Sequence, residues 1–221
     1  MKTELQLFAH PFSSYCQKVF IAFYENDLPF TLRQLGADDP QTDAEFSALW
    51  PIRKMPLLLD RGQAVREATI IIEHLAAHYP GPVKLIPADP AAAVDVRFMD
   101  RFFDNYVMTP QQKFVFDKLR PAEHRDPYGV EEARKMLDTA YRWLDERMRD
   151  REWACGDAFT LADCAAAPSL FYADWTHAIP DEFQHLKRYR QRLLARPSFA
   201  RAVDGGRPYR AWFPLGAPDR D

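Results

Sequence analysis

The strand-like segments of this chain all lie in its first third, and this restriction limits the possible folds more than any other feature. The segments are 5–8, 29–32, 57–59 and 64–66, and the last two are joined by the turn residues 60–62 (DRG). The sequence beyond them shows only helical patterns. We therefore predict one small sheet-containing domain followed by an all-helical remainder.

Three helices are expected within the sheet-containing part. The first starts at Ser13 or Ser14, either of which can cap it, and runs to residue 26. A short helix spans 43–49, and a third opens at Glu67 and stops before the Pro-Gly-Pro sequence at 80–82. The resulting element order is β-α-β-α-β-β-α, an α/β arrangement.

A dense group of prolines marks a linker at 82–88, which divides the chain into domains 1–81 and 89–221. Thr160 and Asp163 have the spacing of a capping box and predict the start of a mostly apolar helix. The helices expected in the second domain are 89–116 with a bend at Pro110, 129–150, 160–172, 182–194 and 197–203. The second domain is expected to be all α.

The composition excludes several classes of function. Of 221 residues, 47% are hydrophobic and 28% are charged, and the net charge of −3 gives no basic surface for nucleic acid. No apolar run reaches the roughly 20 residues of a membrane span, and the polar residues Lys2 and Glu4 after Met1 favour a cytoplasmic protein. The three cysteines lack the spacing of a metal site, so neither a metal nor a disulfide framework is expected.

Pro56 directly precedes the apolar strand 57–59, a position where proline is tolerated only for special reasons. One interpretation is that it opens an edge strand. In this element order, however, the domain resembles the thioredoxin-like fold. That resemblance implies a cis proline that faces the active site.

Five sequence motifs carry a resemblance to the soluble glutathione transferases. They are 13–19 (SSYCQKV), 54–58 (KMPLL), Glu67, 156–163 (GDAFTLAD) and 196–199 (RPSF). The first resembles the active-site sequence of the serine-using classes, such as zeta, and the second resembles the cis-proline motif. The resemblance extends over residues 5–203, and it implies glutathione as co-substrate and a homodimer.

The resemblance also implies a mechanism in which the nucleophile is the sulfur of glutathione. A free thiol titrates near 8.5, so lowering its pKa by about two units, or about 2.7 kcal/mol, makes the reactive thiolate dominant at neutral pH. Ser13 is expected to donate a hydrogen bond to that sulfur, with Ser14 as the second candidate. The alternative is that both serines only cap the helix.

The resemblance assigns the remaining glutathione contacts to two segments. The backbone of Met55, before Pro56, is expected to pair with the cysteinyl part. Lys54 or Arg53 is the candidate to meet the glycyl carboxylate, and a surface role for both is the alternative. Glu67 is expected to face the γ-glutamyl ammonium. At the next position the family usually has a serine, where this chain has Ala68, and a lost hydrogen bond to a charged group costs about 1.5–3 kcal/mol. Thr69 and Arg66 are the candidates to compensate, but successive helical residues point about 100° apart, so compensation is not assumed.

An apolar pocket for a hydrophobic electrophile is expected between the domains. The candidate lining residues are His10, Phe102, Tyr106 and Trp175. Core packing is the alternative for the three aromatic residues, and a hydrogen-bonding role in its loop is the alternative for His10. The predicted function is thus glutathione conjugation, isomerisation or reduction of such a substrate. A non-catalytic interaction module with weak or no glutathione binding is the second hypothesis, and Ala68 favours it. A redox protein that works through Cys16 is the third, although burial of that thiol is the preferred interpretation.

Overall fold

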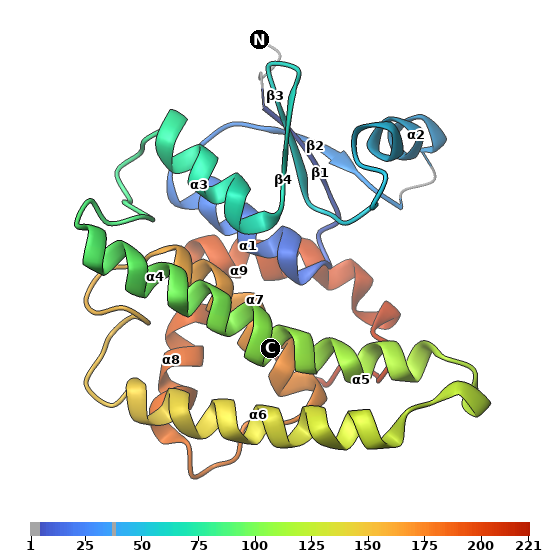
Figure 1. Ribbon diagram of the computed structural model, residues 1–221, viewed down its shortest axis with the longest axis vertical. Helices are drawn as coiled ribbons and strands as arrows, with labels where there is room; N and C mark the ends of the chain where they lie inside the picture. The colour runs from blue at the N-terminus through green and yellow to red at the C-terminus, as the bar shows by residue number, and fades with distance from the viewer. Residues whose placement is uncertain (1–4, 37–38) are drawn as a thin grey trace.

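The computed structural model describes residues 5–36 and 39–221, so the polar start Met1 to Glu4 lies outside the described residues. Four strands form one mixed sheet in the order β2-β1-β3-β4 (Figure 1). β1 runs parallel to β2 and antiparallel to β3, and β3 and β4 form a hairpin. The strands are β1 (Leu5–Ala9), β2 (Thr31–Gln34), β3 (Leu57–Asp60) and β4 (Gln63–Arg66).

The two faces of the sheet pack against different helices because side chains alternate along a strand. Leu5, Leu7 and Ala9 face the main core, which includes residues of α1 (Ser14–Glu25) and α3 (Ala68–His78). Phe8 points the other way and stacks on Phe46 of α2 (Pro40–Leu49), with ring centroids 6.1 Å apart. The sheet thus lies between α2 on one side and α1 with α3 on the other, which confirms the thioredoxin-like α/β fold of the N-terminal part.

Two elements in this part, β2 and α2, differ from the sequence prediction by two residues or more. β2 begins at Thr31 rather than at residue 29, because Pro29 has no N–H to donate to a ladder. α2 begins at Pro40 rather than at residue 43. Asp39 caps it by accepting hydrogen bonds from the backbone N–H groups of Gln41 and Thr42, and a proline is well suited to a first helical position.

The second half of the described chain is helical, as predicted. α7 lies at its centre and is buried over almost its whole length, and the predicted capping box of Thr160 and Asp163 is present at its start. The elements are α4 (Pro90–Phe102), η1 (Phe103–Met108), α5 (Thr109–Leu119), η2 (Ala122–His124), α6 (Pro127–Arg147), α7 (Leu161–Thr176), α8 (Gln184–Ala195), α9 (Pro197–Gly206) and η3 (Arg207–Trp212).

In place of the expected single helix with a bend at Pro110, the structure has three consecutive helical elements. A π-helix, η1, joins α4 to α5, and Pro110 lies in the first turn of α5. A proline cannot donate to the carbonyl four residues earlier and clashes with it, and the wider π turn accommodates that defect just before the proline. Thr109 donates from both its N–H and its hydroxyl to the Asp104 carbonyl.

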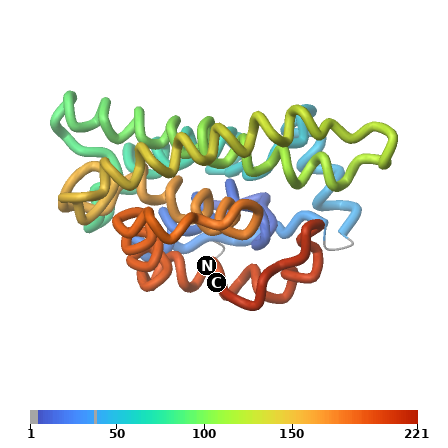
Figure 2. Tube along the Cα trace, turned by 90° about the horizontal axis from the view of Figure 1, so that it is seen from below, coloured from blue at the N-terminus to red at the C-terminus, as the bar shows by residue number. Residues whose placement is uncertain are grey.

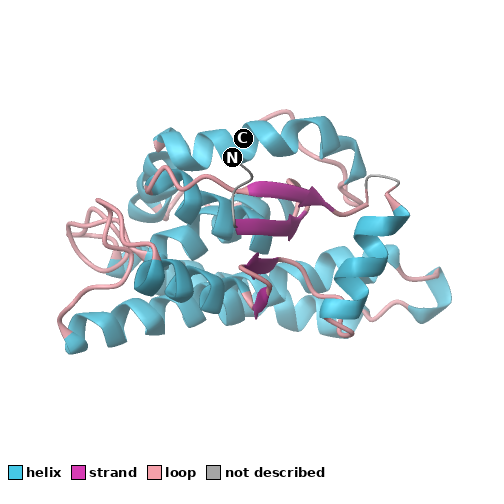
Figure 3. Ribbon diagram, turned by 90° about the horizontal axis from the view of Figure 1, so that it is seen from above, coloured by secondary structure: helices cyan, strands magenta, loops and turns pink. Residues whose placement is uncertain are grey.

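Helix α1 is surrounded by both halves of the molecule. It contacts α3 from its own half and α7 and α9 from the helical half. Figure 2 shows the long α4–α5 rod beside α6, and Figure 3 shows the sheet between this layer and the C-terminal helices. The segment from 79 to 89 contains neither helix nor strand, which is compatible with the proposed division into 1–81 and 89–221. Among the described residues, no helix is both long and apolar enough to cross a membrane.

Candidate active site

Three chain segments meet at one edge of the sheet, and strand register brings them there. Phe8 of β1 lies opposite Leu57 of β3, and Leu57 lies opposite Arg66 of β4. The loop after β1, the residues before β3 and the residue after β4 therefore emerge together. They carry Ser13, the cis Met55-Pro56 bond and Glu67, so the predicted cis proline is confirmed.

Ser13 occupies the N-cap position of α1, but its side chain makes no capping hydrogen bond. Its side chain is instead hydrogen-bonded to Cys16, whose sulfur also accepts the His10 N–H at 3.5 Å. The expectation that Ser13 caps the helix through its hydroxyl is thus wrong, because the hydroxyl turns toward this sulfur. Ser14 is the first residue of α1 and is partly buried.

The Cys16 thiol is fully buried, and burial raises its pKa to about 11. A thiolate is the form that attacks or binds metal, so a thiol of this pKa is inert near neutral pH. The preferred interpretation, a buried packing role for Cys16, agrees with this environment. Cys155 and Cys164 also have raised pKa values because of burial.

A cavity of about 350 Å³ opens beside this edge, between α1, α3 and α4. Glu67 and Ala68 line it from the start of α3, and Tyr15 lines it from α1. Glu67 has a φ of 71°, and the first N–H groups of α3 that follow it have no partner within the helix. The other lining residues are Thr69, Ile70, Glu73, Arg97, Asp100, Arg101 and Asp104.

A buried ionic network forms the back wall of this cavity and joins the two halves of the chain. Lys18 of α1 is 1% exposed, and its Nζ lies 2.5 Å from Asp100 and 2.9 Å from Asp104. Arg101 Nη2 donates to Asp100 at 2.9 Å and to Asp104 at 2.5 Å. Two cations therefore balance two carboxylates in a largely dry site, where unpaired charge is costly.

Neither of the two candidates to compensate for Ala68 is available to do so. Thr69 Oγ1 donates to Asp100 at 2.8 Å and accepts hydrogen bonds from Lys18 and Arg101. The Arg66 guanidinium donates to the carbonyl of Leu49 at the end of α2 and to that of Ala64 within β4. Both side chains thus have structural roles, and the hydroxyl missing at position 68 has no substitute among them.

Tyr15 and Arg101 are among the cavity residues that were not identified from the sequence as site residues. Tyr15 is hydrogen-bonded to the Thr109 side chain, and burial together with the charge of Asp104 raises its pKa to about 12. It is therefore a neutral phenol that can donate a hydrogen bond at neutral pH. Arg101 is a half-exposed cation of the cavity. The four-residue spacing of Asp100 and Asp104 around it was the local signal available for Arg101.

Among the described residues, the cations at the cavity pair with every lining carboxylate except that of Glu67. Arg97 forms a bidentate pair with Glu73, and Arg101 and Lys18 balance Asp100 and Asp104. Within 5–36 and 39–221, no side chain hydrogen-bonds or ion-pairs with Glu67. The cavity therefore carries an unbalanced negative charge at Glu67, which suits a ligand ammonium group.

The predicted electrophile-pocket residues lie in three separate aromatic groups. His10 packs against Tyr209 and Trp212 of η3, with ring centroids 4.5 and 5.4 Å away. Trp175 packs against Phe171 and Phe213. The third group consists of Phe98, Phe102, Tyr106 and Trp143.

The remaining predicted contacts are accessible to different degrees. Lys54 is exposed, and Met55 is partly buried between the two cores on either side of the sheet. His10 is buried. Its Nδ1 accepts the Phe12 N–H, and burial lowers its pKa. Among the described residues, no group of three or more His, Cys, Asp or Glu side chains is placed to hold a metal ion.

Comparisons with known proteins match this architecture over most of the chain. A family model described as the glutathione S-transferase N-terminal domain matches residues 7–83, and one described as the C-terminal domain of the same family matches residues 107–197. Glutathione S-transferase GstB of Escherichia coli is 27% identical over 205 residues, which cover 86% of this chain and 93% of GstB.

Two further relatives differ in what their names describe. FtsZ-localized protein A of Caulobacter vibrioides is 28% identical over 210 residues, which cover 90% of each chain. A glutathione S-transferase of Methylobacterium radiotolerans, solved as a complex with glutathione sulfonate, is 30% identical. Its structure aligns with a TM-score of 0.78 over 90% of this chain and 94% of that one.

Proposed function

This chain belongs to the glutathione S-transferase family, and from that membership we propose that it binds glutathione at the edge defined by Ser13, Met55 and Glu67. The observation that carries the proposal is the convergence of these residues beside a cavity with unbalanced negative charge. The γ-glutamyl ammonium faces Glu67, and the glutathione carboxylate meets the N–H groups at the start of α3. The cysteinyl part pairs with the Met55 backbone, and Lys54 takes the glycyl carboxylate.

The proposed chemistry is thiolate attack on a hydrophobic electrophile. The Ser13 hydroxyl rotates from Cys16 toward the glutathione sulfur and donates a hydrogen bond to it, and the positive end of α1 favours the same anion. The thiol proton passes to water. The thiolate then forms a bond to the electrophilic carbon, and the leaving group departs or the adduct rearranges.

Replacement of Ser13 tests this mechanism. Loss of a hydrogen bond to a thiolate costs about 1.5–3 kcal/mol, so Ser13→Ala should lower kcat/KM for glutathione and chlorodinitrobenzene by about tenfold to a hundredfold. It should also shift the pH profile of kcat/KM upward, toward the ordinary thiol pKa near 8.5. Ser14→Ala is the matched control and should leave both quantities unchanged. Equal activity in the parent and Ser13→Ala would refute the role of Ser13.

A second candidate function is an interaction module of the same fold with weak or no glutathione binding. The observation that favours it is Ala68, because the nearby polar side chains Thr69 and Arg66 already have other partners. Under this hypothesis Ser13→Ala changes nothing, because no thiol is bound. The fold and the exposed surfaces then carry the function.

A homodimer is the proposed assembly, and an exposed aromatic patch on α4, η1 and α6 supports it. Phe98 is 46% exposed, Tyr106 45% and Trp143 37%, and all three contact the buried ring of Phe102. A contiguous apolar patch of this kind is typical of an interface between proteins. Trp143→Glu should therefore halve the mass measured by light scattering, whereas Trp212→Glu, outside the patch, should not. An unchanged mass for Trp143→Glu would place the interface elsewhere.

A further inference from the structure

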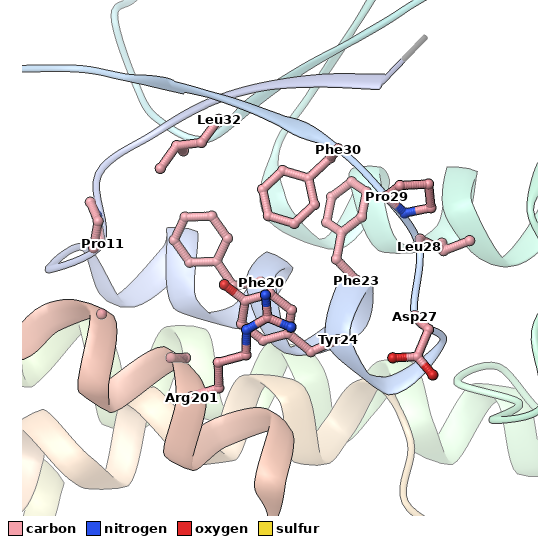
Figure 4. Close-up of a pocket in the computed structure, with 12 residues that line it drawn as sticks. Pro11, Phe20, Phe23, Tyr24, Asp27, Leu28, Pro29, Phe30, Leu32 and Arg201 are labelled. Atoms are coloured by element: carbon pink, nitrogen blue, oxygen red, sulfur yellow. The ribbon is translucent and has the colours of Figure 1, made fainter. Parts of the chain in front are cut away.

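A second cavity, of about 490 Å³, lies on the opposite side of α1 from the candidate active site (Figure 4). Its walls come from α1, the segment leading into β2, and α9. Ser13, Met55 and Glu67 are not part of its lining. The residues that line it are Pro11, Phe20, Phe23, Tyr24, Asp27, Leu28, Pro29, Phe30, Leu32, Arg201, Ala202 and Gly205.

Aromatic rings form one wall of this cavity, where the partly exposed Tyr24 and Phe30 pack on the buried Phe20 and Phe23. Phe30 packs against Phe20 and Phe23 with ring centroids 5.9 and 4.4 Å away, and Phe20 stacks on Tyr24 at 6.1 Å. Figure 4 shows these rings grouped around the open space, with Leu32 pointing toward it from the β2 side. A flat aromatic ligand would gain both apolar contact and ring stacking here.

One cation stands at this aromatic surface. The Arg201 guanidinium lies 4.0 Å from the centroid of the Tyr24 ring, in a cation–π contact. Over residues 5–36 and 39–221, no carboxylate lies within ion-pair distance of it. Asp27 also lines the cavity, beyond Tyr24 (Figure 4). A guanidinium that is stacked and has no anionic partner is well placed to receive a planar carboxylate.

We infer that this cavity binds an aromatic monocarboxylate, with its ring on Tyr24 and Phe30, the partly exposed rings of the lining, and its carboxylate on Arg201. The cavity adjoins the active-site loop through Pro11, whose carbonyl accepts a hydrogen bond from Gln17 Nε2. It nevertheless shares none of the predicted glutathione contacts. The bound acid is therefore a ligand distinct from glutathione, and the inference stands whether or not the chain is a transferase.

The test is calorimetric titration of the full chain with naphthoate and with its neutral isostere, naphthamide. The parent should bind naphthoate at least about tenfold more tightly than naphthamide, as expected for loss of one charge-assisted hydrogen-bonded pair. Arg201→Gln should weaken the binding of naphthoate by about tenfold and leave the affinity for naphthamide unchanged. Arg142→Gln, another exposed arginine, is the matched control and should bind both as the parent does.

Two further variants locate the bound ligand. A methyl group at Gly205 would meet only Pro11 Cβ, at 3.9 Å, so Gly205→Met should fold and fill the cavity, and it should abolish binding of both ligands. Asp27→Asn removes a negative charge near that of the naphthoate carboxylate, so it should increase the affinity for naphthoate slightly. Saturating glutathione should leave the naphthoate Kd unchanged.

Several results would overturn the inference. Equal affinity for the acid and the amide, or equal affinity of the parent and Arg201→Gln, would remove Arg201 from the site. Unchanged binding by Gly205→Met, or displacement by glutathione, would place the ligand in another cavity. Absence of naphthoate binding by the parent up to about 5 mM would exclude the site, since that limit corresponds to only about 3 kcal/mol of binding free energy.

Discussion

Helix α1 has two sides with opposite chemistry. Tyr15 and Lys18 lie on the side that faces α3 and α4, among the charges of both halves of the chain. Phe20 and Tyr24, turned well away from them at 100° per residue, line a second cavity, where Arg201 has no ion-pair partner among the described residues. The same helix therefore places a charged, ordered wall beside the proposed glutathione site and an apolar one behind it. Residues that are close together in the sequence of α1 therefore line different cavities, because their side chains point in different directions around the helix.

The largest effect is expected from breaking the charged side. Lys18→Met leaves Asp100 and Asp104 buried with only Arg101 as counter-charge, and removal of one partner from a buried ionic network costs about 3–5 kcal/mol. Urea unfolding followed by circular dichroism measures the change. Lys135→Met breaks an exposed pair with Glu132 and should leave the unfolding midpoint nearly unchanged. Similar midpoints for the two variants would mean that the network does not hold the two halves together.

A smaller effect is expected from the hydroxyl on the same side. Because Tyr15 is a neutral phenol that lines the cavity, we expect its hydroxyl to turn from Thr109 and donate a hydrogen bond to bound glutathione. Tyr15→Phe should then weaken glutathione binding about fivefold to tenfold, as for loss of one ordinary hydrogen bond, while unfolding stays close to that of the parent. Tyr24→Phe alters the hydroxyl on the aromatic side and is the control. Equal glutathione affinity in the parent and in Tyr15→Phe would show that Tyr15 makes no hydrogen bond to bound glutathione.

The smallest effect concerns the buried thiol between the two sides. The pKa of Cys16 is about 11 when folded, against an ordinary value of 9.0, so the folded state holds the thiol proton more tightly. The stability it contributes is complete below about pH 9 and is lost as the pH rises through about 11. From about pH 8 to pH 10 the parent should lose about 1 kcal/mol more unfolding free energy than Cys16→Ala. Parallel pH profiles for the two proteins would show that the thiol is not held in this way.

Much of the fold could be predicted because its signals are local. The turn at Gly62, which has a φ of 85°, and the capping box of Thr160 and Asp163 each depend on residues a few positions apart. The convergence of Ser13, Pro56 and Glu67 followed from element order together with a resemblance to a known family. The shift of β2 and the earlier start of α2 came from Pro29 and Asp39, whose effects on strand and helix ends were not weighed.

The long-range parts of the site could not be predicted in the same way. Lys18 contacts Asp104 across 86 positions, and nothing in the neighbourhood of either residue indicates the other. Thr69 could be proposed as a substitute for a missing serine hydroxyl, but its engagement by Asp100 depends on how α3 packs against α4. The packing of η3 on His10 likewise joins the two ends of the chain.

The most direct test of the account is calorimetric titration of glutathione into the parent chain and into Ala68→Ser. We predict micromolar to low-millimolar binding by the parent, which corresponds to about 4–8 kcal/mol. Ala68→Ser should bind about tenfold to a hundredfold more tightly, because the restored hydroxyl donates to the γ-glutamyl carboxylate at a position no other side chain serves. Absence of binding by both proteins would contradict the proposed glutathione site and leave the interaction module as the function of this chain.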